Sequence, residues 1–461
     1  MITRSIHNSK AQGPIASLPL SPAYFAWSVC MHGIASIGTI LAFFFSNLQP
    51  YFWNRGLKHA QNFRNLVSAK HKDRYLFFCS SAGEYEQGLP LARKLENAGN
   101  DVIICFFSLS GYQFAQARKE KRYFFLSPID SYWSWKRVFR ALKPKASFVV
   151  RHEVWPGFLK LASSWNEGVF LINASKSLSA KSQVQHRLKS KLFKYFRKIY
   201  FVSQHEQTYF TQNLQIPAQK LICTGDSKYD SVFERSMLKK AEAGKHQDLL
   251  DQFGKVDSRL VLGSAWEKDV ELGLGALADL RQQVNKSLQV MVALHKPEEP
   301  ALTAVEQDCQ KLKLSFRRLS TMLPLQDKPQ DIPRAPYDVI IVDSVGILSE
   351  LYCCGQLAFI GGALHYQVHN VLEPAFYALA LAYGPLYKNS GEAVLLAEAK
   401  VISIIKNKND LAKWWTDQIH TGYENGQRAN ALIKSYLGAT EEILADLKAE
   451  HIFYDGKTTD H

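Results

Sequence analysis

The sequence predicts an α/β protein built from two Rossmann-like domains that face each other across a cleft, with a membrane-anchor helix in front of them. Three observations predict this class. Apolar runs rich in β-branched and aromatic residues alternate with helical stretches, which is the pattern of parallel sheets covered on both faces. The runs fall into two series with a polar, charged segment between them. A long run without Lys, Arg, Asp or Glu precedes the first series.

The uncharged run, residues 23–45, predicts the anchor. As a helix that rises ~1.5 Å per residue, it would cover the ~30 Å hydrocarbon core of a bilayer. It is longer than the apolar region of a cleaved signal peptide. His32 and several small or hydroxyl residues dilute its hydrophobicity, so an amphipathic helix in the membrane interface stays open. Basic residues after the run, Arg55, Lys58 and Arg64, favour an orientation with the main body in the cytoplasm.

Composition excludes several other classes of protein. With 46% hydrophobic and 21% charged residues, the chain as a whole is neither disordered nor collagenous. The seven cysteines have no CxxC spacing, so we expect neither a zinc ribbon nor a disulfide framework. The net charge of +14 indicates a phosphate-bearing partner, which on composition alone is nucleic acid, anionic lipid or nucleotide.

Much of the positive charge lies in two acid-free stretches. Seven Lys and Arg residues precede the first acidic residue. The second stretch, residues 168–205, carries eight more, and Leu188, Leu192, Phe196 and Ile199 recur within it at helical spacing. We expect an apolar helix face surrounded by basic residues that contact anionic headgroups or a phosphorylated substrate. A crossover helix with a solvated face is the alternative.

The apolar runs predict the strands in order. The first series lies at residues 75–80, 101–108, 123–128, 146–150, 169–175, 199–204 and 221–227. The second series lies at residues 259–265, 288–295, 338–344, 357–363, 379–385 and 401–406, and a long helical stretch from 411 to about 449 follows it. Ligands of such sheets bind beyond the carboxyl ends of the strands. We therefore expect the functional residues in the loops that follow the strands.

The two series also predict the domain boundaries. We expect a basic segment and anchor over residues 1–50 and a first Rossmann-like domain over residues 51–235. A linker over residues 236–257 would lead to a second Rossmann-like domain over residues 258–435. Residues 436–461 would form a C-terminal helix and tail.

Short polar clusters follow the predicted strands, whereas GxGxxG, GxxxxGK[ST], HExxH and His/Cys metal spacings are missing from the sequence. In their order along the chain, from about residue 50 to 435, these clusters resemble the motifs of bacterial 3-deoxy-D-manno-octulosonic acid (Kdo) transferases. The clusters are Ser81-Ala82-Gly83-Glu84, Glu153-Val154-Trp155-Pro156, Asn173-Ala174, Gly225-Asp226-Ser227-Lys228-Tyr229-Asp230, Gly263-Ser264, Asp343-Ser344-Val345-Gly346, Gly361-Gly362 and His369-Asn370-Val371-Leu372-Glu373-Pro374.

The resemblance implies a fold, a reaction and its partners. Kdo transferases are GT-B glycosyltransferases that move Kdo from CMP-Kdo onto a lipid A precursor during lipopolysaccharide assembly. The resemblance therefore implies CMP-Kdo, a lipid A precursor and an anionic membrane surface as partners, at the inner membrane and without nucleic acid. No cofactor and no metal are expected, because CMP leaves as a monophosphate that positive side chains and helix N-termini can stabilise.

The resemblance makes Glu84 the expected general base for an inverting reaction. Glu84 follows a strand through small residues, so its carboxylate can face the cleft and take a proton from an attacking hydroxyl. A carboxylate that only stabilises the dipole at a helix start is the alternative. We expect acceptor-side or supporting roles for Ser81, Gly83, Glu153 and Lys228.

Donor binding is expected in the second domain. His369 and Glu373 lie four residues apart at a predicted helix start, so they would share one face near N–H groups that favour phosphate. A capped, partly buried helix start is the alternative. The full set of expected donor residues is Gly263, Ser264, His295, Lys296, Arg318, Gly346, Gly361, Gly362, His369, Asn370 and Glu373.

The chain departs from the family pattern at several positions. Ser175 stands where the family usually has Arg, Ile347 where it has Glu, Gln367-Val368 where it has Gly-Gly, and Ala265-Trp266 where it has Thr-His. Leu294-His295-Lys296-Pro297 only loosely resembles a Pro-Arg-His-Pro motif. Two alternatives therefore stay open: a GT-B transferase that uses another nucleotide sugar, and a basic, noncatalytic, membrane-associated binding protein.

Overall fold

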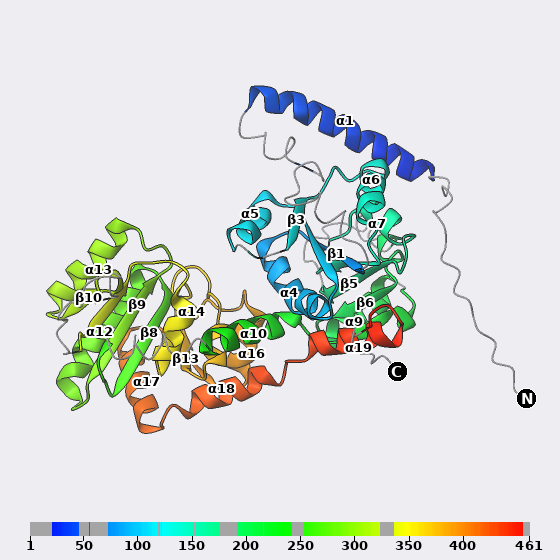
Figure 1. The fold of residues 1–461 in the computed structure, drawn as a ribbon. Coiled ribbons are helices and arrows are strands. Elements are labelled where there is room, and N and C mark those ends of the chain that lie inside the picture. The colour runs from blue at the N-terminus through cyan, green and yellow to red at the C-terminus, as the bar shows by residue number, and fades with distance from the viewer. Residues whose placement is uncertain are drawn as a thin grey trace, which may run out of the picture. The chain divides into compact units, whose positions relative to one another are not determined.

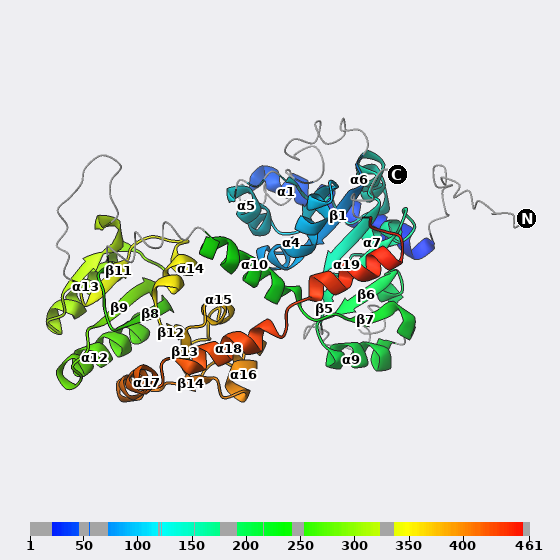
Figure 2. The same ribbon diagram turned by 60° about the horizontal axis from the view of Figure 1, so that its bottom comes forward.

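The computed structural model describes residues 21–45, 55, 72–118, 120, 122–151, 153–175, 191–214, 216–241, 253–322 and 336–454. The chain divides into two compact units. Unit 1 comprises Met1–Lys228 and Gly438–His461, and unit 2 comprises Tyr229–Leu437. Within the described residues, each unit contains one parallel sheet of seven strands, with helices on both faces (Figures 1 and 2). The predicted class, an α/β protein with two Rossmann-like domains, is confirmed.

The sheet of unit 1 has the strand order β3-β2-β1-β4-β5-β6-β7. All seven predicted runs form strands, each within a few residues of the predicted bounds. The strands are β1 (Arg74–Cys79), β2 (Asp101–Phe106), β3 (Tyr123–Leu126), β4 (Ala146–Val150), β5 (Val169–Ala174), β6 (Lys198–Phe201) and β7 (Leu221–Cys223). The helices after them are α4 (Ala82–Asn97), α5 (Leu109–Ala117), α6 (Tyr132–Leu142), α7 (Pro156–Ala162), α9 (Gln204–Leu214) and α10 (Ser227–Ala241), the last of which continues into unit 2.

Alternate side chains of β1 enter two cores on opposite faces of this sheet. Tyr75 and Phe77 join the core that also contains residues of α4, whereas Leu76 and Phe78 join the core formed with α6 and α7. All four side chains are fully buried. Burial on both faces explains why a continuous apolar run, rather than an alternating pattern, marks this strand in the sequence.

The sheet of unit 2 has the order β10-β11-β9-β8-β12-β13-β14. Its strands are β8 (Ser258–Ala265), β9 (Leu288–Leu294), β10 (Phe316–Arg318), β11 (Val339–Val342), β12 (Leu357–Ile360), β13 (Ala380–Tyr383) and β14 (Ile402–Ile404). The helices of this unit are α12 (Glu267–Gln283), α13 (Glu299–Lys311), α14 (Leu348–Leu351), α15 (Leu372–Phe376), α16 (Gly391–Glu398), α17 (Lys408–His420) and α18 (Glu424–Lys434). Apolar runs predict six of these strands but not β10, an edge strand of three residues.

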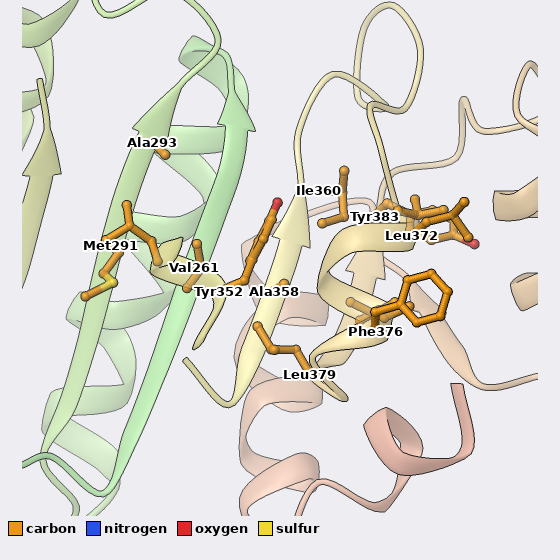
Figure 3. Close-up of a cluster of buried hydrophobic side chains, with 14 of the residues drawn as sticks. Val261, Met291, Ala293, Tyr352, Ala358, Ile360, Leu372, Phe376, Leu379 and Tyr383 are labelled. Atoms are coloured by element: carbon orange, nitrogen blue, oxygen red, sulfur yellow. The ribbon is translucent and has the colours of Figure 1, made fainter. Parts of the chain in front are cut away.

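Two cores flank this second sheet as well. One contains residues of α12, α13 and α17, and the other contains residues of α10, α15 and α18. Figure 3 shows part of the second core, in which Tyr352 lies beside Val261 of β8 and Ala358 of β12. The buried ring of Tyr352 occupies space next to Gly263, where a β-carbon would collide with the phenol oxygen. This packing holds the end of β8 in place.

Helix α1 (Pro22–Phe44) agrees with the predicted anchor to within one residue at each end. Among the described residues, it is the one helix that is long and apolar enough to cross a membrane. Its first half packs on α6 and α7 of unit 1 (Figure 1). The indole N–H of Trp27 donates to the backbone oxygen and carboxylate of Asp130, at 2.9 and 3.1 Å. Lys58 and Arg64, on which the predicted orientation partly depends, lie outside the described residues.

The C-terminal region differs from the prediction in two ways. The predicted helical stretch from 411 to 449 consists of α17, α18 and α19 (Ala439–Ala449), because residues with positive φ, including Tyr423 and Gly438, interrupt it. Helix α19 (Figure 2) belongs to unit 1. Its side chains Ile443 and Leu447 enter the same core as α4. The change of unit falls at residues 228/229 and 437/438, whereas we expected 235/236 and 435/436.

The second basic stretch also differs from the expected helix. Residues 176–190, including Leu188, lie outside the described residues. Leu192 and Phe196 are buried, but Ile199 belongs to strand β6 rather than to a helix. Arg197 pairs with Glu167 and Glu450, and Lys198 pairs with Asp446 and Glu450. These two basic side chains therefore contact carboxylates of unit 1 instead of forming an exposed basic face.

Candidate functional site

Glu84 lies at the carboxyl end of β1, in the first turn of α4. Ser81 is the N-cap residue, and its hydroxyl accepts a 3.4 Å hydrogen bond from the backbone N–H of Glu84. The Glu84 carboxylate folds back and accepts a hydrogen bond from the backbone N–H of Ser80. The spacing Ser81-Ala82-Gly83-Glu84 is that of a capping box, so Glu84 also helps to start the helix. Glu84 thus lies at the expected strand end, and its place in the first turn of α4 also suits the alternative, a carboxylate that stabilises the helix dipole.

Burial makes the Glu84 carboxylate unusually basic. The side chain is only 6% exposed, and this desolvation raises its pKa from 4.5 to about 7. The charge of Glu153 raises the pKa further, while the hydrogen bonds from Ser80 and Ser81 and the charge of Arg151 lower it. A carboxylate with a pKa near 7 is well suited to take a proton at neutral pH, because a useful fraction is ionised and each ionised group is a stronger base.

Glu153 and Trp155 form the neighbouring strand-end loop, between β4 and α7. The indole N–H of Trp155 donates a 2.7 Å hydrogen bond to the Glu153 carboxylate. The Trp155 ring stacks on Phe107 with 4.4 Å between ring centroids. Arg151, at the start of this loop, has a positive φ of 71°. The order β1-β4 within the sheet places this loop beside Glu84, which explains why Glu153 and Arg151 both act on the Glu84 pKa.

A third strand-end loop of unit 1 closes around Asn173. The Asn173 amide donates to the Ser227 hydroxyl at 2.6 Å and accepts from the Ser227 backbone N–H at 3.1 Å. The same hydroxyl donates to the backbone oxygen of Gln87, which ties this loop to α4. Lys228 follows directly, and its backbone N–H donates to the Asp226 carboxylate at 2.8 Å. Asn173 and Ser227 therefore hold the chain segment that carries Lys228.

In unit 2, the loops after β8 and β12 come into very close contact. The buried Asp269 carboxylate accepts hydrogen bonds from the backbone N–H groups of Trp266 and Gly362, both at 2.9 Å. A β-carbon at Gly361 would lie 2.8 Å from this carboxylate and would collide with the backbone oxygen of Ser264. Gly362 has φ +90°, a conformation that glycine adopts without strain. These glycines let the two loops approach each other to the distance that Asp269 bridges.

Three aromatic side chains stack above this loop pair. The His295 ring stacks with Trp266, at 4.9 Å between ring centroids, and with His369, at 4.5 Å, and both pairs are nearly parallel. The Trp266 indole N–H donates to Nε2 of His369 at 3.2 Å, so this nitrogen acts as an acceptor. Burial, together with the charges of His295 and His365, lowers the pKa of His369. The lowered pKa favours the form of His369 in which Nε2 carries no proton. We refer to Trp266, His295 and His369 as the ring stack.

His369 and Glu373 do not share a helix face, contrary to expectation. Helix α15 begins at Leu372. The Asn370 side-chain oxygen accepts a 3.0 Å hydrogen bond from the Leu372 backbone N–H. This Asn side chain closes a turn that keeps His369 outside the helix. The Glu373 carboxylate lies 2.6 Å from the guanidinium of Arg235 on α10. Glu373 thus joins α15 to α10 through an ion pair.

Other expected donor residues are separate from the ring stack or engaged elsewhere. The Arg318 guanidinium binds Glu299 through two contacts of 2.8 and 3.0 Å and Glu306 through a third of 2.6 Å. These hydrogen bonds raise the pKa of Arg318 further above its ordinary value. Lys296 is exposed beside His295, and Gly346 has φ +86° in the loop after β11. The structure thus brings together Gly263, Ser264, His295, Gly361, Gly362 and His369.

Sequence reasoning missed Arg151, Trp266 and Asp269 as members of these sites. Arg151 lies two residues before Glu153, and a cation next to a strand-end carboxylate is a usable signal. Asp269 lies three residues after Trp266 and accepts a hydrogen bond from its backbone N–H at the start of α12, which is the carboxylate half of a capping box. The stacking of Trp266 on His295 has no local signal, because the two residues lie on different strand-end loops.

Within the described part of the chain, no cluster of three or more His, Cys, Asp or Glu side chains is arranged to hold a metal ion. The expectation of a metal-independent reaction stays a prediction. Candidate groups for binding an anionic ligand in unit 2 are the exposed Lys296 and the edges of His295 and His365.

Comparison with known proteins shows what this chain is similar to. Residues 54–231 match the family described as 3-deoxy-D-manno-octulosonic-acid transferase (kdotransferase). A 3-deoxy-D-manno-octulosonic acid transferase of Haemophilus influenzae is 26% identical over 384 residues, which cover 80% of this chain and 85% of that protein. A transferase of the same description from Chlamydia muridarum is 28% identical over 292 residues, which cover 62% of this chain and 63% of that protein.

A bifunctional glycosyltransferase/methyltransferase of Fusobacterium nucleatum is 24% identical over 343 residues, 72% of this chain. This chain spans about half of that protein, since the match covers 49% of its length. Among solved structures, a UDP-GlcNAc 2-epimerase from Neisseria meningitidis bound to UDP-GlcNAc has a TM-score of 0.56 at 14% identity, and the match covers 82% of this chain and 100% of that one. This likeness supports the GT-B-like fold alone. The family match and the relatives agree with the resemblance that the motifs indicate.

Proposed function

We propose that this chain, a member of the Kdo transferase family, transfers Kdo from CMP-Kdo to a lipid A precursor in lipopolysaccharide biosynthesis, with Glu84 as general base. The observation that carries the proposal is the buried Glu84 carboxylate with a pKa of about 7, at a strand end within the residues that match the family. The strand-end position suits a ligand site in this type of sheet.

The proposed reaction is a single displacement with inversion at the anomeric carbon of Kdo. The Glu84 carboxylate takes the proton of an acceptor hydroxyl as the hydroxyl oxygen forms a bond to that carbon. The bond from the same carbon to the phosphate oxygen breaks, and its electron pair leaves with CMP. A positioned base of this kind contributes ~10² to 10⁴-fold in rate, or roughly 3 to 5 kcal/mol of barrier. Glu153 supports the base, because its negative charge raises the pKa of Glu84.

The donor is proposed to bind at the strand ends of unit 2. The flat, partly exposed ring stack offers a surface on which a cytosine base can lie, and aromatic faces favour such contacts. Lys296 follows His295 directly and is exposed, so its ammonium group can reach the phosphate or the Kdo carboxylate. Gly361 and Gly362 allow close approach of the backbone. Arg318 and Glu373 are engaged with other side chains, and we propose positioning roles for them.

The membrane location is also proposed. Helix α1 is an apolar N-terminal helix that exposes large side chains, among them Phe43 at 77% and Phe44 at 76%. Such a surface suits attachment to the inner membrane with both units in the cytoplasm, where CMP-Kdo would be present. Lipid attachment fits an acceptor that itself resides in the membrane.

Product analysis tests the proposed function. The purified full chain in detergent is incubated with CMP-Kdo and a tetra-acylated lipid A precursor, and the lipid is examined by mass spectrometry. We expect added masses of one or more Kdo residues, together with release of CMP. The proposal fails if CMP-Kdo is not consumed while a different nucleotide sugar is, since that result supports another GT-B transferase. Consumption of no nucleotide sugar would support a noncatalytic binding protein.

A further inference from the structure

Unit 1 contains an apolar cavity between α1 and the strand-end loops. Its volume is about 370 Å³, within the ~300 to 1,000 Å³ usual for ligand sites. Met31 and Ala35 line it from α1, Phe78 from β1, Phe107 from the loop after β2, and Trp135 and Trp155 from α6 and the start of α7. The surface presented to an occupant is therefore mainly hydrocarbon and aromatic ring.

The two charged residues of the cavity wall are engaged by protein groups. The Asp130 carboxylate accepts hydrogen bonds from Trp27 and Trp135 and from the backbone N–H groups of Gly157 and Phe158, at 2.8 to 3.1 Å. The Arg55 guanidinium donates to the Ser127 hydroxyl at 3.1 Å and to nearby backbone oxygens. Polar ligands would compete with these bonds, whereas an apolar ligand would leave them intact.

The cavity adjoins the environment of Glu84. Trp155 lines the cavity and also donates its indole N–H to Glu153, the carboxylate whose charge raises the Glu84 pKa. Phe107 lines the cavity and is followed by Ser108, whose backbone N–H donates to the oxygen of Ser80 at 3.2 Å. The N–H of Ser80 in turn binds the Glu84 carboxylate. A molecule that fills the cavity thus lies next to the proposed acceptor site.

The position of α1 connects the cavity to a lipid surface. Ser28, Ala35, Gly38 and Ala42 are buried and form one stripe on α1 between residues 28 and 42. The other side of the helix exposes apolar side chains, including Ile37 and Ile40 at 61% each. A helix that is covered along one side and apolar on the other suits the membrane interface better than a span surrounded by lipid. The cavity then lies directly beneath the helix that contacts the hydrocarbon region.

We propose that this cavity binds one hydrocarbon chain of the lipid acceptor and so brings the acceptor headgroup to Glu84. The inference rests on the proposed function, because it takes the acceptor to be an acylated lipid. Burial of each CH₂ group of the chain is favourable, so even a partly inserted chain selects acylated over deacylated acceptors. Lining residues from α1 and from the strand-end loops make the helix part of the binding site, in addition to its role in attachment.

Cavity-filling variants of the full chain test this proposal. Ala35→Trp and Met31→Trp place a large ring in the cavity, and Ile37→Trp adds the same ring on the exposed side of α1 as a matched control. The Michaelis constants are measured in mixed micelles for a tetra-acylated lipid A precursor and for its fully deacylated disaccharide. We expect at least a tenfold increase in KM for the acylated acceptor in both cavity variants. KM for the deacylated acceptor, and both values for Ile37→Trp, should stay within twofold of the wild type.

The proposal is overturned if both folded cavity variants keep KM for the acylated acceptor within twofold of the wild type. It is also overturned if KM rises equally for the acylated and the deacylated acceptor, because the substitutions would then disturb the Glu84 site itself. Photolabelling with a diazirine-bearing fatty acid provides a readout without turnover. Labelling of peptides that contain Met31 or Phe78, reduced in Ala35→Trp, supports hydrocarbon-chain binding in the cavity even if no Kdo is transferred. Labelling without Kdo transfer would refute the proposed function alone. Kdo transfer without labelling of the cavity would refute hydrocarbon-chain binding in the cavity alone.

Discussion

Replacement of Glu84 by Gln isolates the proposed proton transfer. Gln keeps the size of the side chain and an oxygen that can accept the hydrogen bond from the Ser80 backbone N–H. It cannot take up the proton of the acceptor hydroxyl. We therefore expect the rate of Kdo transfer to fall by ~10² to 10⁴-fold, the usual contribution of a positioned general base. Binding of CMP to unit 2 should not change, because Glu84 belongs to unit 1.

The same substitution should increase stability at alkaline pH. The folded state holds the Glu84 proton up to about pH 7, whereas the unfolded state loses it near 4.5. Between these values the folded state binds more protons, so the free energy of unfolding falls as the pH rises. At ~1.4 kcal/mol for each unit of pKa, the loss approaches about 3 kcal/mol above pH 7. Gln does not ionise, so Glu84→Gln should exceed the wild type in stability by up to this amount at pH 8 and show no advantage near pH 4.

Initial rates between pH 5.5 and 9, combined with urea unfolding at pH 4 and pH 8, measure both effects. The wild-type rate should rise with pH and level off above about 7, since the carboxylate must be ionised. Glu86→Gln, two residues later on α4, serves as the matched control and should retain at least half of the wild-type rate. The reasoning is refuted if Glu84→Gln transfers Kdo within tenfold of the wild type. A variant that is slower and also less stable at pH 8 would identify Glu84 as a capping residue without a role as base.

Three further changes test other parts of the structure. Gly361→Ala should lower the free energy of unfolding by about 1 to 3 kcal/mol and weaken CMP-Kdo binding in calorimetry, because its β-carbon collides with the facing loop. Gly391→Ala, with open space around it, should change neither quantity. Equal effects of the two substitutions would contradict the packing argument. Trp266→Phe removes the N–H donor to His369, so the pKa of His369 should rise in an NMR titration, and an unchanged pKa would contradict the hydrogen bond. Deletion of residues 1–50 should move the protein to the soluble fraction, and retention of the shortened chain on membranes in high salt would show that α1 is not the main attachment.

The sequence predicts the strands well because the burial of each strand requires apolar residues within that strand itself. A central strand of a parallel sheet needs apolar side chains on both faces, so runs such as residues 75–80 and 101–108 identify β1 and β2 without knowledge of their neighbours. Strand β10 is missed because its sequence, Phe316 to Arg318, is short, lies at the edge and remains half-exposed. Helix α1 is predicted for a similar local reason, since an uncharged run of this length is rare outside membranes or cores.

Long-range packing decides what the sequence does not predict. Helix α19 packs in unit 1 because Ile443 and Leu447 share a core with Tyr75, more than three hundred residues earlier, and no periodicity in the chain records that partner. The break between α18 and α19 depends on the positive φ of Gly438, which a glycine allows but does not require.

The candidate site also has features that the sequence determines and features that only the tertiary structure decides. By itself, the sequence determines which polar residues follow which strands. Strand ends are the ligand-binding edge of such sheets, so this order makes Glu84, Glu153 and His369 candidates. Only the tertiary structure decides their chemistry. The pKa of Glu84 near 7 depends on burial and on the charge of Glu153, and the lowered pKa of His369 depends on burial and on the charges of His295 and His365. Desolvation and charge interactions act through space, so residues distant in the chain set them.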